Sequence, residues 1–450
     1  MRHREPATDP HKLRSELCSP NRRADTTVRT PEVLDRGPCD IEYRLLMSSR
    51  SDISNGHERV PRTADEASAL SSSLPEFKLE TYLARWEFSA RYHMTASDAE
   101  SLSVRELLAL GGDAALETLL DLRLSYTESY GAPDLRATIA ATYETCAAED
   151  ILCFAGAEEG LYCFYHALLG PQDHAIVITP DYQSAETVPL ALCAVTGVAL
   201  DPRESWTLHL DEVAAAIRPN TRALYINFPH NPTGKILERD RFDGLIDLCR
   251  RHGIWILSDE VYRLIEHEPH KRLQQAVDAY ERGVSLNVMS KAYGLPGLRI
   301  GWIACRDRVL LERMVRYKHY LSICNSGPSE RLALIALQHR ERILARTRAI
   351  ARDGYAQVAA FLAEFPELFE SYSPDGGVVM FPRYTGAAGA EAFCRRMVEQ
   401  GGVVLLPSSI YASALSPTPA DRFRIGYGRR NVDSGLSAMR ELILHDRDFP

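Results

Sequence analysis

The stretch RALYINFPHNPTGKILERDRFDGLIDLCRRHGIWILSDE, residues 222–260, decides the fold. Its ends, 222–229 and 253–260, are short apolar runs rich in β-branched and aromatic residues, which is typical of buried strands. Between them, residues 239–252 predict a helix. A strand, a helix and a second strand in this order favour a parallel sheet with helices on its faces, and such strands are continuously apolar because both of their faces are buried.

The same alternation extends on both sides of this stretch. Further strands are predicted at HAIVITP (174–180), GVSLNVMS (283–290) and RIGWIAC (299–305). Further helices are predicted at 79–92, 134–148, 158–168, 184–195 and 327–365. After residue 365 come the runs GGVVMFPRY, VVLLPSS and FRIGYGRRN. We therefore expect an α/β protein with a mostly parallel sheet flanked by helices, and a smaller α/β domain built from the chain ends.

We expect four parts along the chain. Residues 1–75 are polar, contain many Pro and Ser and lack periodicity, so we expect a disordered or loosely attached extension. Residues 76–120 are predicted to form an N-terminal arm and part of the small domain. The large domain is expected at 121–320 and the C-terminal small domain at 321–450.

Composition also excludes several classes of function. The net charge of −9 over 450 residues argues against non-specific nucleic-acid binding. The ten cysteines include no CxxC pair and no cluster with histidine at metal-ligand spacing, so we expect free thiols, a reducing compartment and no metal. No apolar run is long enough to span a membrane, and the N-terminus lacks the apolar stretch of a signal peptide. We expect a cytoplasmic protein.

Unusual polar residues follow three of the predicted strands. Asn231 follows YINFP, Asp259 follows WILS and Lys291 follows LNVMS. Individually they are typical of a turn, a helix cap and a surface charge. Together they lie where open α/β sheets bind ligands, at the carboxyl ends of strands. The chain has six lysines, and Lys291 stands between an apolar run and the glycine-rich GLPGLRIGW, which indicates a functional amine.

These residues belong to segments that resemble a known family. NFPHNPTG (227–234), SDEVY (258–262) and SKAYGLPGLRIGW (290–302) are similar, in order and separation, to the three signature segments of the class I/II aminotransferases. LSYTESYGAPDLR (124–136) and RFRIGYG (422–428) resemble two further segments of that family. The resemblance covers residues 76–445. It implies the type I fold of pyridoxal 5′-phosphate (PLP) enzymes, amino acid and 2-oxo acid substrates, and a homodimer whose subunits share each active site.

The resemblance implies roles for five residues around the cofactor ring. Lys291 would carry PLP as a Schiff base and then act as the base at the substrate Cα. Asp259 would pair with the pyridine nitrogen and keep the ring an electron sink. Asn231 and Tyr262 would hydrogen-bond its 3′-oxygen, and Tyr182 would stack on the ring.

The phosphate of the cofactor needs positive charge and N–H donors. Gly156, Ala157 and Glu158 open a predicted helix, whose N-terminus suits an anion. Arg299 would add a bidentate cation, with Ser290 assisting.

Two further residues match the family pattern, and two positions differ from it. Tyr126 resembles the tyrosine that reaches the phosphate of the neighbouring subunit, and Arg424 the arginine that binds the substrate α-carboxylate. Val288 stands where a Ser or Thr is usual, and so does Glu158, whose charge is unfavourable beside a phosphate unless it turns away or pairs with a cation. No arginine for a second substrate carboxylate is identified.

The chemistry of the substrate stays open at this point. Transamination is the main hypothesis, with Lys291 moving the Cα proton. Segment 91–107 resembles a subgroup that includes capreomycidine synthase, which cyclises a hydroxylated arginine. The alternative is therefore elimination, replacement or ring closure at Cβ or Cγ by the same residues. A PLP-sensing transcription regulator is disfavoured because residues 1–75 show no helix-turn-helix pattern, and a silent structural protein because the whole site set is present.

Overall fold

The computed structural model describes residues 74–445, and every structural statement below concerns that range. The prediction of a disordered or loosely attached extension at 1–75 therefore falls almost entirely outside the described residues. Within the described part, no helix is both long enough and apolar enough to cross a membrane.

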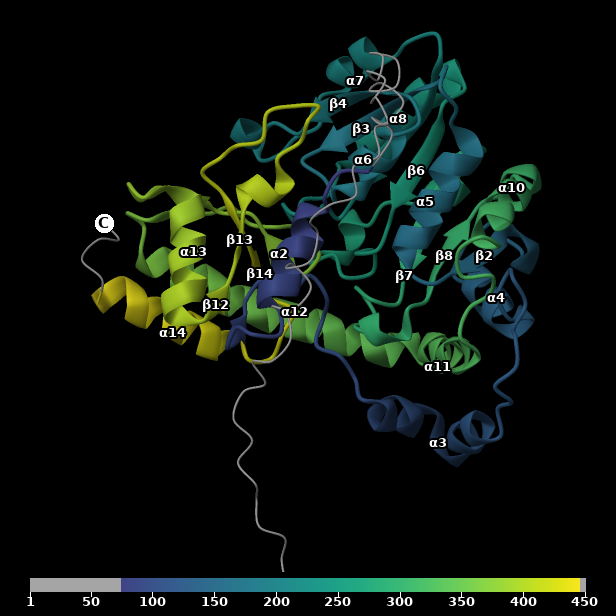
Figure 1. Ribbon diagram of the computed structural model, residues 1–450, viewed down its shortest axis with the longest axis horizontal. Helices are drawn as coiled ribbons and strands as arrows, with labels where there is room; N and C mark the ends of the chain where they lie inside the picture. The colour runs from purple at the N-terminus through teal and green to yellow at the C-terminus, as the bar shows by residue number, and fades with distance from the viewer. Residues whose placement is uncertain (1–73, 446–450) are drawn as a thin grey trace, which may run out of the picture. The chain divides into compact units, whose positions relative to one another are not determined.

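A seven-stranded sheet forms the centre of the described chain (Figure 1). Its spatial order is β2-β8-β7-β6-β5-β3-β4, and β8 is antiparallel to both β7 and β2, whereas the remaining neighbours are parallel. The strands are β2 (Ile151–Phe154), β3 (His174–Thr179), β4 (Ala194–Ala199), β5 (Thr221–Asn227), β6 (Trp255–Asp259), β7 (Gly283–Val288) and β8 (Gly301–Ala304). This is the mostly parallel sheet that the sequence predicted.

Helices cover both faces of this sheet. They are α5 (Ala157–Leu168), α6 (Ser184–Leu190), α7 (Leu210–Ala216), α8 (Arg239–His252), α9 (Ala276–Ala279) and α10 (Arg308–Lys318). Alternate residues of one strand enter different cores: Tyr225 of β5 packs with α5 and α10, whereas Ile226 packs with α7 and α8. Because both faces are buried, the strands carry continuous apolar runs instead of alternating ones.

Segments from both ends of the chain build a second group of elements. Near the N-terminal end are α2 (Lys78–Trp86), β1 (Tyr92–His93), α3 (Val104–Leu120) and α4 (Pro133–Ala140). Toward the C-terminus are α11 (Gly327–Gln338), α12 (Arg340–Glu364), β9 (Phe369–Glu370), β10 (Val379–Met380), β11 (Arg383–Tyr384), α13 (Gly389–Gly401), β12 (Val403–Val404), β13 (Leu406–Pro407), β14 (Phe423–Gly426) and α14 (Val432–His445). Strand β1 pairs in parallel with β12, and β14 lies between β10 and β13. Figure 1 shows these short strands beside α13 and α14. The chain ends thus build the smaller part expected of this fold; the exact domain boundaries stay predictions.

Several predicted helices end earlier than expected. The predicted helix 184–195 is wrong beyond Leu190, since residues 194–199 form β4 and Pro189, which lacks an N–H, lies at the end of α6. The predicted helix 134–148 ends at Ala140, after which the N–H groups of Glu144 and Thr145 bond to the carboxylate of Asp278. The predicted helix 79–92 ends at Trp86, and 327–365 is divided at His339.

Several elements were not predicted, among them the helices α3, α7, α10, α13 and α14 and the strands β2 and β4. Strand β2 has only four residues, too few to show a pattern. Helix α3 carried a readable signal: Ser103 and Glu106 form a capping box, in which each side chain accepts from the backbone N–H of the other residue. The helix is kinked at Gly112, where φ is 69°, and this interrupts its apolar periodicity.

Gly283 at the start of β7 allows a test of the packing that places the site. A Cβ there would overlap the backbone carbonyl of Ala276, so Gly283→Ala should lower the free energy of unfolding by about 3 kcal/mol. A Cβ on Gly297 would have no atom within 4 Å, so Gly297→Ala is the control and should change stability by less than about 0.5 kcal/mol. Urea unfolding of both variants measures this, and equal stability would contradict the packing described.

Candidate active site

A cavity of about 440 Å³ lies at the carboxyl ends of the parallel strands. Asn231 follows β5, Asp259 ends β6, and Lys291 follows β7. The structure thus brings to one place residues that are far apart in sequence, as the position of polar residues after strands suggested. Of the predicted site residues, the lining includes Ala157, Glu158, Tyr182, Asn231, Asp259, Tyr262, Ser290, Lys291, Arg299 and Arg424.

Lys291 places an amine in this cavity. Its Nζ donates a hydrogen bond to the hydroxyl of Ser97 over 2.7 Å. Removal from water lowers the pKa of Lys291, because burial disfavours the ammonium form, while the nearby carboxylate of Asp98 acts in the opposite direction. A lysine with a lowered pKa is both a nucleophile and a base.

Asp259 places a buried carboxylate in the same cavity. Its oxygens accept hydrogen bonds from the hydroxyl of Tyr225 at 3.0 Å and from the backbone N–H of Val261 at 3.1 Å. Burial nevertheless raises the pKa of Asp259 to about 6, since these two bonds do not replace full hydration. A cationic group bound beside it would restore the charged form.

Arg424, on β14, is a buried cation without a carboxylate partner in residues 74–445. Its side chain is 2% exposed. The guanidinium donates to the hydroxyl and carbonyl oxygens of Thr95 at 3.1 and 2.7 Å, and to Asn231 Oδ1 at 3.1 Å. It also donates to the hydroxyl of Tyr411 at 2.5 Å. Because a buried charge is costly without a counter-charge, this arrangement is suited to an anionic ligand group.

A cradle for a second anion lies where helix α5 begins. Gly156 has φ of 105°, and a Cβ there would lie 2.5 Å from Nη2 of Arg299. The side chain of Arg299 makes no ion pair within the described residues and donates only to the carbonyl of Pro296 at 3.3 Å. Helix α5 starts at Ala157, so its free N–H groups and the guanidinium face the same place.

Glu158 stands in this cradle without opposing an anion. Its Oε2 accepts from the hydroxyl of Ser184 on α6 at 2.9 Å. Burial raises the pKa of Glu158 to about 7, so a large fraction is uncharged at neutral pH. The carboxyl group is thus held toward α6 and is partly protonated. The repulsion of a phosphate that the sequence led us to expect at Glu158 is therefore reduced.

The predicted tyrosines occupy different positions. The hydroxyl of Tyr182 donates to Glu80 at 2.8 Å, and the hydroxyl of Tyr262 donates to the carbonyl of Ser97 at 2.9 Å. Both tyrosines line the cavity. Tyr126 does not line it in its own chain and is 88% exposed. Gly156 is not among the lining residues, but a Cβ there would meet the guanidinium of Arg299, which does line the cavity.

The sequence did not reveal one wall of the cavity. Glu80 and Glu87 come from α2 and the turn after it, Asp98 from the following segment, and Arg429 from the segment after β14. Arg429 pairs with both oxygens of Asp98 at 2.9 and 2.8 Å. The carboxylate of Glu87 makes no hydrogen bond or ion pair within residues 74–445, and its pKa is raised by burial, by Asp98 and by Glu80. The tandem arginines of RIGYGRR were the available signal.

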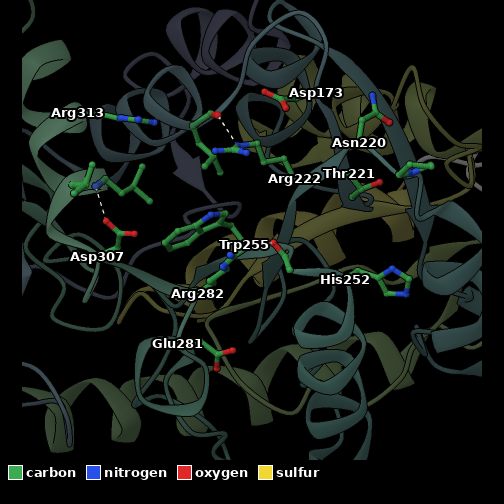
Figure 2. A pocket seen from close by; sticks show the side chains of 15 residues that line it. Asp173, Asn220, Thr221, Arg222, His252, Trp255, Glu281, Arg282, Asp307 and Arg313 are labelled. Carbon is green, nitrogen blue, oxygen red and sulfur yellow. Dashed lines mark hydrogen bonds between the residues drawn. The ribbon is translucent and has the colours of Figure 1, made fainter.

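A second cavity, of about 630 Å³, lies at the amino ends of the parallel strands, beside Thr221 of β5 and Trp255 of β6. Figure 2 shows its lining side chains. Its polar groups serve the fold: Arg222 donates to the carbonyl of Leu168 at 3.1 Å, Arg282 donates to the carbonyl of Gly253, and Asp307 accepts from the first turn of α10. Figure 2 shows arginines and carboxylates mixed around Trp255.

The pKa of Asp259 gives a pH-dependent prediction for the cofactor-free protein. Between its ordinary value of 3.8 and about 6, the folded state binds more protons than the unfolded state, so stability falls as pH rises. Asp259→Asn lacks this loss and should exceed the wild type by roughly 3 kcal/mol at pH 7, with a small difference at pH 4. Urea unfolding across this pH range measures the difference; a constant offset would contradict the buried-carboxylate assignment.

These features fit PLP, the cofactor that the family resemblance implies. Lys291 offers the amine for its aldehyde, Asp259 a carboxylate for its ring nitrogen, and Arg299 with the start of α5 a cradle for its phosphate. The Cβ overlap at Gly156 shows that the cradle depends on a glycine there.

Comparisons with known proteins show the family of the chain. The family described as "Aminotransferase class I and II" matches residues 113–435. Capreomycidine synthase of Streptomyces vinaceus is 30% identical over 375 residues, which cover 82% of this chain and 94% of that protein. Arginine–pyruvate transaminase AruH of Pseudomonas aeruginosa is 32% identical over 327 residues, covering 70% and 80%.

Solved structures show the same architecture. A PLP-dependent aminotransferase from Streptococcus suis superimposes with a TM-score of 0.77 at 28% identity and covers 83% of this chain and 99% of that one. The PLP-dependent cyclase OrfR gives a TM-score of 0.74 at 24% identity, with 82% and 97% covered, and shows the common fold. The predicted type I fold, family and cofactor are confirmed. The chain is a PLP-dependent transferase and belongs to the class I and II aminotransferase family.

Proposed function

We propose that this aminotransferase takes its amino group from an amino acid with a cationic side chain, and that Lys291 holds PLP covalently. One observation carries the proposal: a single cavity contains an amine, a buried carboxylate and two arginines without carboxylate partners among the described residues. One of its walls, called the acidic wall below, carries the carboxylates of Glu80, Glu87 and Asp98 beside Arg429. Each of these groups has a counterpart in a PLP-bound amino acid.

The chain's own residues account for the proton transfers. PLP, when bound, withdraws electrons from the substrate Cα. The amine of Lys291, with its pKa lowered by burial, accepts the Cα proton and returns it. Asp259 holds a proton on the ring nitrogen, because its carboxylate needs a cationic partner in this buried position.

The groups around Lys291 and Asp259 bind the substrate carboxylate and the cofactor phosphate in this proposal. Arg424 receives the α-carboxylate of the substrate with the fork of its guanidinium, beside Asn231. Arg299, Ser290 and the N–H groups at the start of α5 receive the phosphate. Tyr182 and Tyr262 line the same cavity, where Tyr182 would stack on the ring and Tyr262 would hydrogen-bond its 3′-oxygen.

A second copy of the chain completes the site in this proposal. Tyr126 is 88% exposed and Leu124 84% exposed, and large apolar side chains at such exposure are suited to an interface. Tyr126 would reach the phosphate of the partner. Such a homodimer in the cytoplasm agrees with the free cysteines of the described chain, and the net charge of −9 opposes binding to nucleic acid.

The acidic wall supports the choice of a cationic side chain. Glu80 and Asp98 already have partners, whereas Glu87 has none among the described residues. Burial, Asp98 and Glu80 raise the pKa of Glu87, while Arg429 and Lys291 act in the opposite direction. A guanidinium or ammonium group bound beside Glu87 would favour its charged form. The similarity to an arginine–pyruvate transaminase also supports this substrate class.

Ring closure or elimination is the second candidate function. The match to capreomycidine synthase over 94% of that protein favours it. The same residues would serve this route. Lys291 removes the Cα proton, as in transamination. The electron pair left at Cα then expels a leaving group from Cβ and is not used to take up a proton at the cofactor.

Product analysis separates the two functions. The protein is incubated with pyruvate as the amino acceptor and one amino acid as the donor: arginine, lysine, aspartate or leucine. The alanine and the 2-oxo acid formed in each reaction are then measured. We expect alanine from arginine or lysine at a rate at least about tenfold above that from aspartate, since the acidic wall repels a second carboxylate. Lys291→Ala should give none. Release of chloride and ammonia from β-chloroalanine, without any alanine formed in the amino acid series, would instead establish the elimination route.

Glu87 allows a test of the substrate class. Glu87→Gln keeps the shape and removes the charge, so kcat/KM for the cationic substrate should fall about tenfold or more while that for leucine changes by less than about threefold. Glu76→Gln, an exposed change just before α2, is the control. An equal change for both substrates in Glu87→Gln would contradict the assignment.

A further inference from the structure

Ser97 is the residue whose side chain contacts the Lys291 amine. We propose that the Ser97 hydroxyl is a positioning group that holds this amine in the cavity through a direct hydrogen bond whenever the amine is not bonded to the cofactor. The proposal rests on the proposed function of Lys291 and assigns a role to a residue that the family motifs do not contain.

The contact is short and specific. Lys291 Nζ lies 2.7 Å from Ser97 Oγ, and this is the only hydrogen bond that the amine makes within residues 74–445. The ring of Tyr262 lies beside the amine, with its centroid 6.0 Å from Nζ. A lysine amine on a four-carbon stem has many rotamers, so one hydrogen bond from a fixed partner restricts it strongly.

Ser97 is itself held by strand β14 and the residues that follow it. The N–H of Gly426 donates to the carbonyl of Met94 at 2.7 Å, and the N–H of Glu100 donates to the carbonyl of Gly428 at 2.7 Å. These two bonds bracket Ser97 on both sides. Its own carbonyl accepts from the hydroxyl of Tyr262 at 2.9 Å.

Side chains and close packing fix the same segment. Arg424 binds Thr95, and Arg429 binds Asp98 with two hydrogen bonds. A Cβ on Gly428 would lie 2.6 Å from the carbonyl oxygen of Asp98, so the segment lies directly against the backbone after β14. The hydroxyl of Ser97 is therefore presented at a fixed point.

The hydroxyl differs from the charged groups around the amine. Asp98, Asp259 and Glu80 favour the ammonium form of Lys291, whereas burial and Arg424 oppose it. Glu87, Glu158, Arg299 and Arg429 also line the cavity. Ser97 accepts a hydrogen bond from the ammonium form without adding charge, so it stabilises the protonated amine moderately and leaves it able to give the proton back.

The test measures the amine itself in cofactor-free protein. Lys291 is labelled by reductive methylation across a pH series, and the labelled peptide is quantified by mass spectrometry. Ser97→Ala should lower the apparent pKa of Lys291 by roughly one unit, because the ammonium form loses its acceptor. In the loaded enzyme the same variant should lower kcat about tenfold with KM within about twofold.

An isosteric pair and a nearby serine provide the controls. Ser97→Thr keeps the hydroxyl and should retain the wild-type pKa and kcat, whereas Ser97→Val has the same shape and should behave like Ser97→Ala. Ser101→Ala, in the same segment, should match the wild type. A wild-type pKa and kcat in Ser97→Val, or equal losses in the Thr and Val variants, would overturn the proposal.

A separate measurement distinguishes this failure from failure of the proposed function. Borohydride treatment of the PLP-loaded wild type should fix the cofactor to Lys291. If that adduct is absent, the assignment of Lys291 is wrong and so is the role of Ser97. If it forms and the pKa of Lys291 is indifferent to the hydroxyl at position 97, the role of Ser97 alone is refuted.

Discussion

The buried guanidinium of Arg424 is the interaction on which the site depends. It connects β14 near the C-terminal end of the chain to Thr95 near the N-terminal end of the described residues and to Asn231 after β5. Removing such a cation from water is costly, and its hydrogen bonds to neutral oxygens offset part of that cost. A substrate carboxylate can offset the remaining part of that cost. The guanidinium that joins three segments of the chain therefore also favours binding of an anionic group in the cavity.

Burial is the common cause of the unusual protonation in this cavity. It lowers the pKa of Lys291 and raises those of Asp259 and Glu158. In an unfilled site all three shifts represent destabilisation, because each group would be better solvated outside. A bound cofactor supplies the missing partners, so part of the stability of the working protein comes from its ligand.

The central part of the fold and site could be predicted from the sequence because it depends on local patterns. Apolar runs indicated the strands, and parallel strands bring their carboxyl ends to one edge; Asn231, Asp259 and Lys291 therefore had to meet. Helix α8 matched its prediction at both ends because its pattern is complete between Glu238 and Gly253, a left-handed C-cap.

The remaining parts depend on contacts that leave no local pattern. Ser97 meets Lys291 across 194 positions, and no periodicity in segment 91–107 indicates that contact. Glu87 is an ordinary polar residue after a helix until the fold places it beside Asp98 and Glu80. Short strands such as β2 are set by their neighbours and not by propensity. The role of Tyr126 stays a prediction, because it concerns a second copy of the chain.

A crystal structure of the protein grown with PLP would test most directly whether Lys291 carries the cofactor. We predict continuous electron density from Lys291 Nζ to the cofactor, with the ring nitrogen at the carboxylate of Asp259 and the phosphate between Arg299 and the first residues of α5. A cofactor bound elsewhere, or a ring nitrogen without Asp259 as its partner, would contradict this prediction.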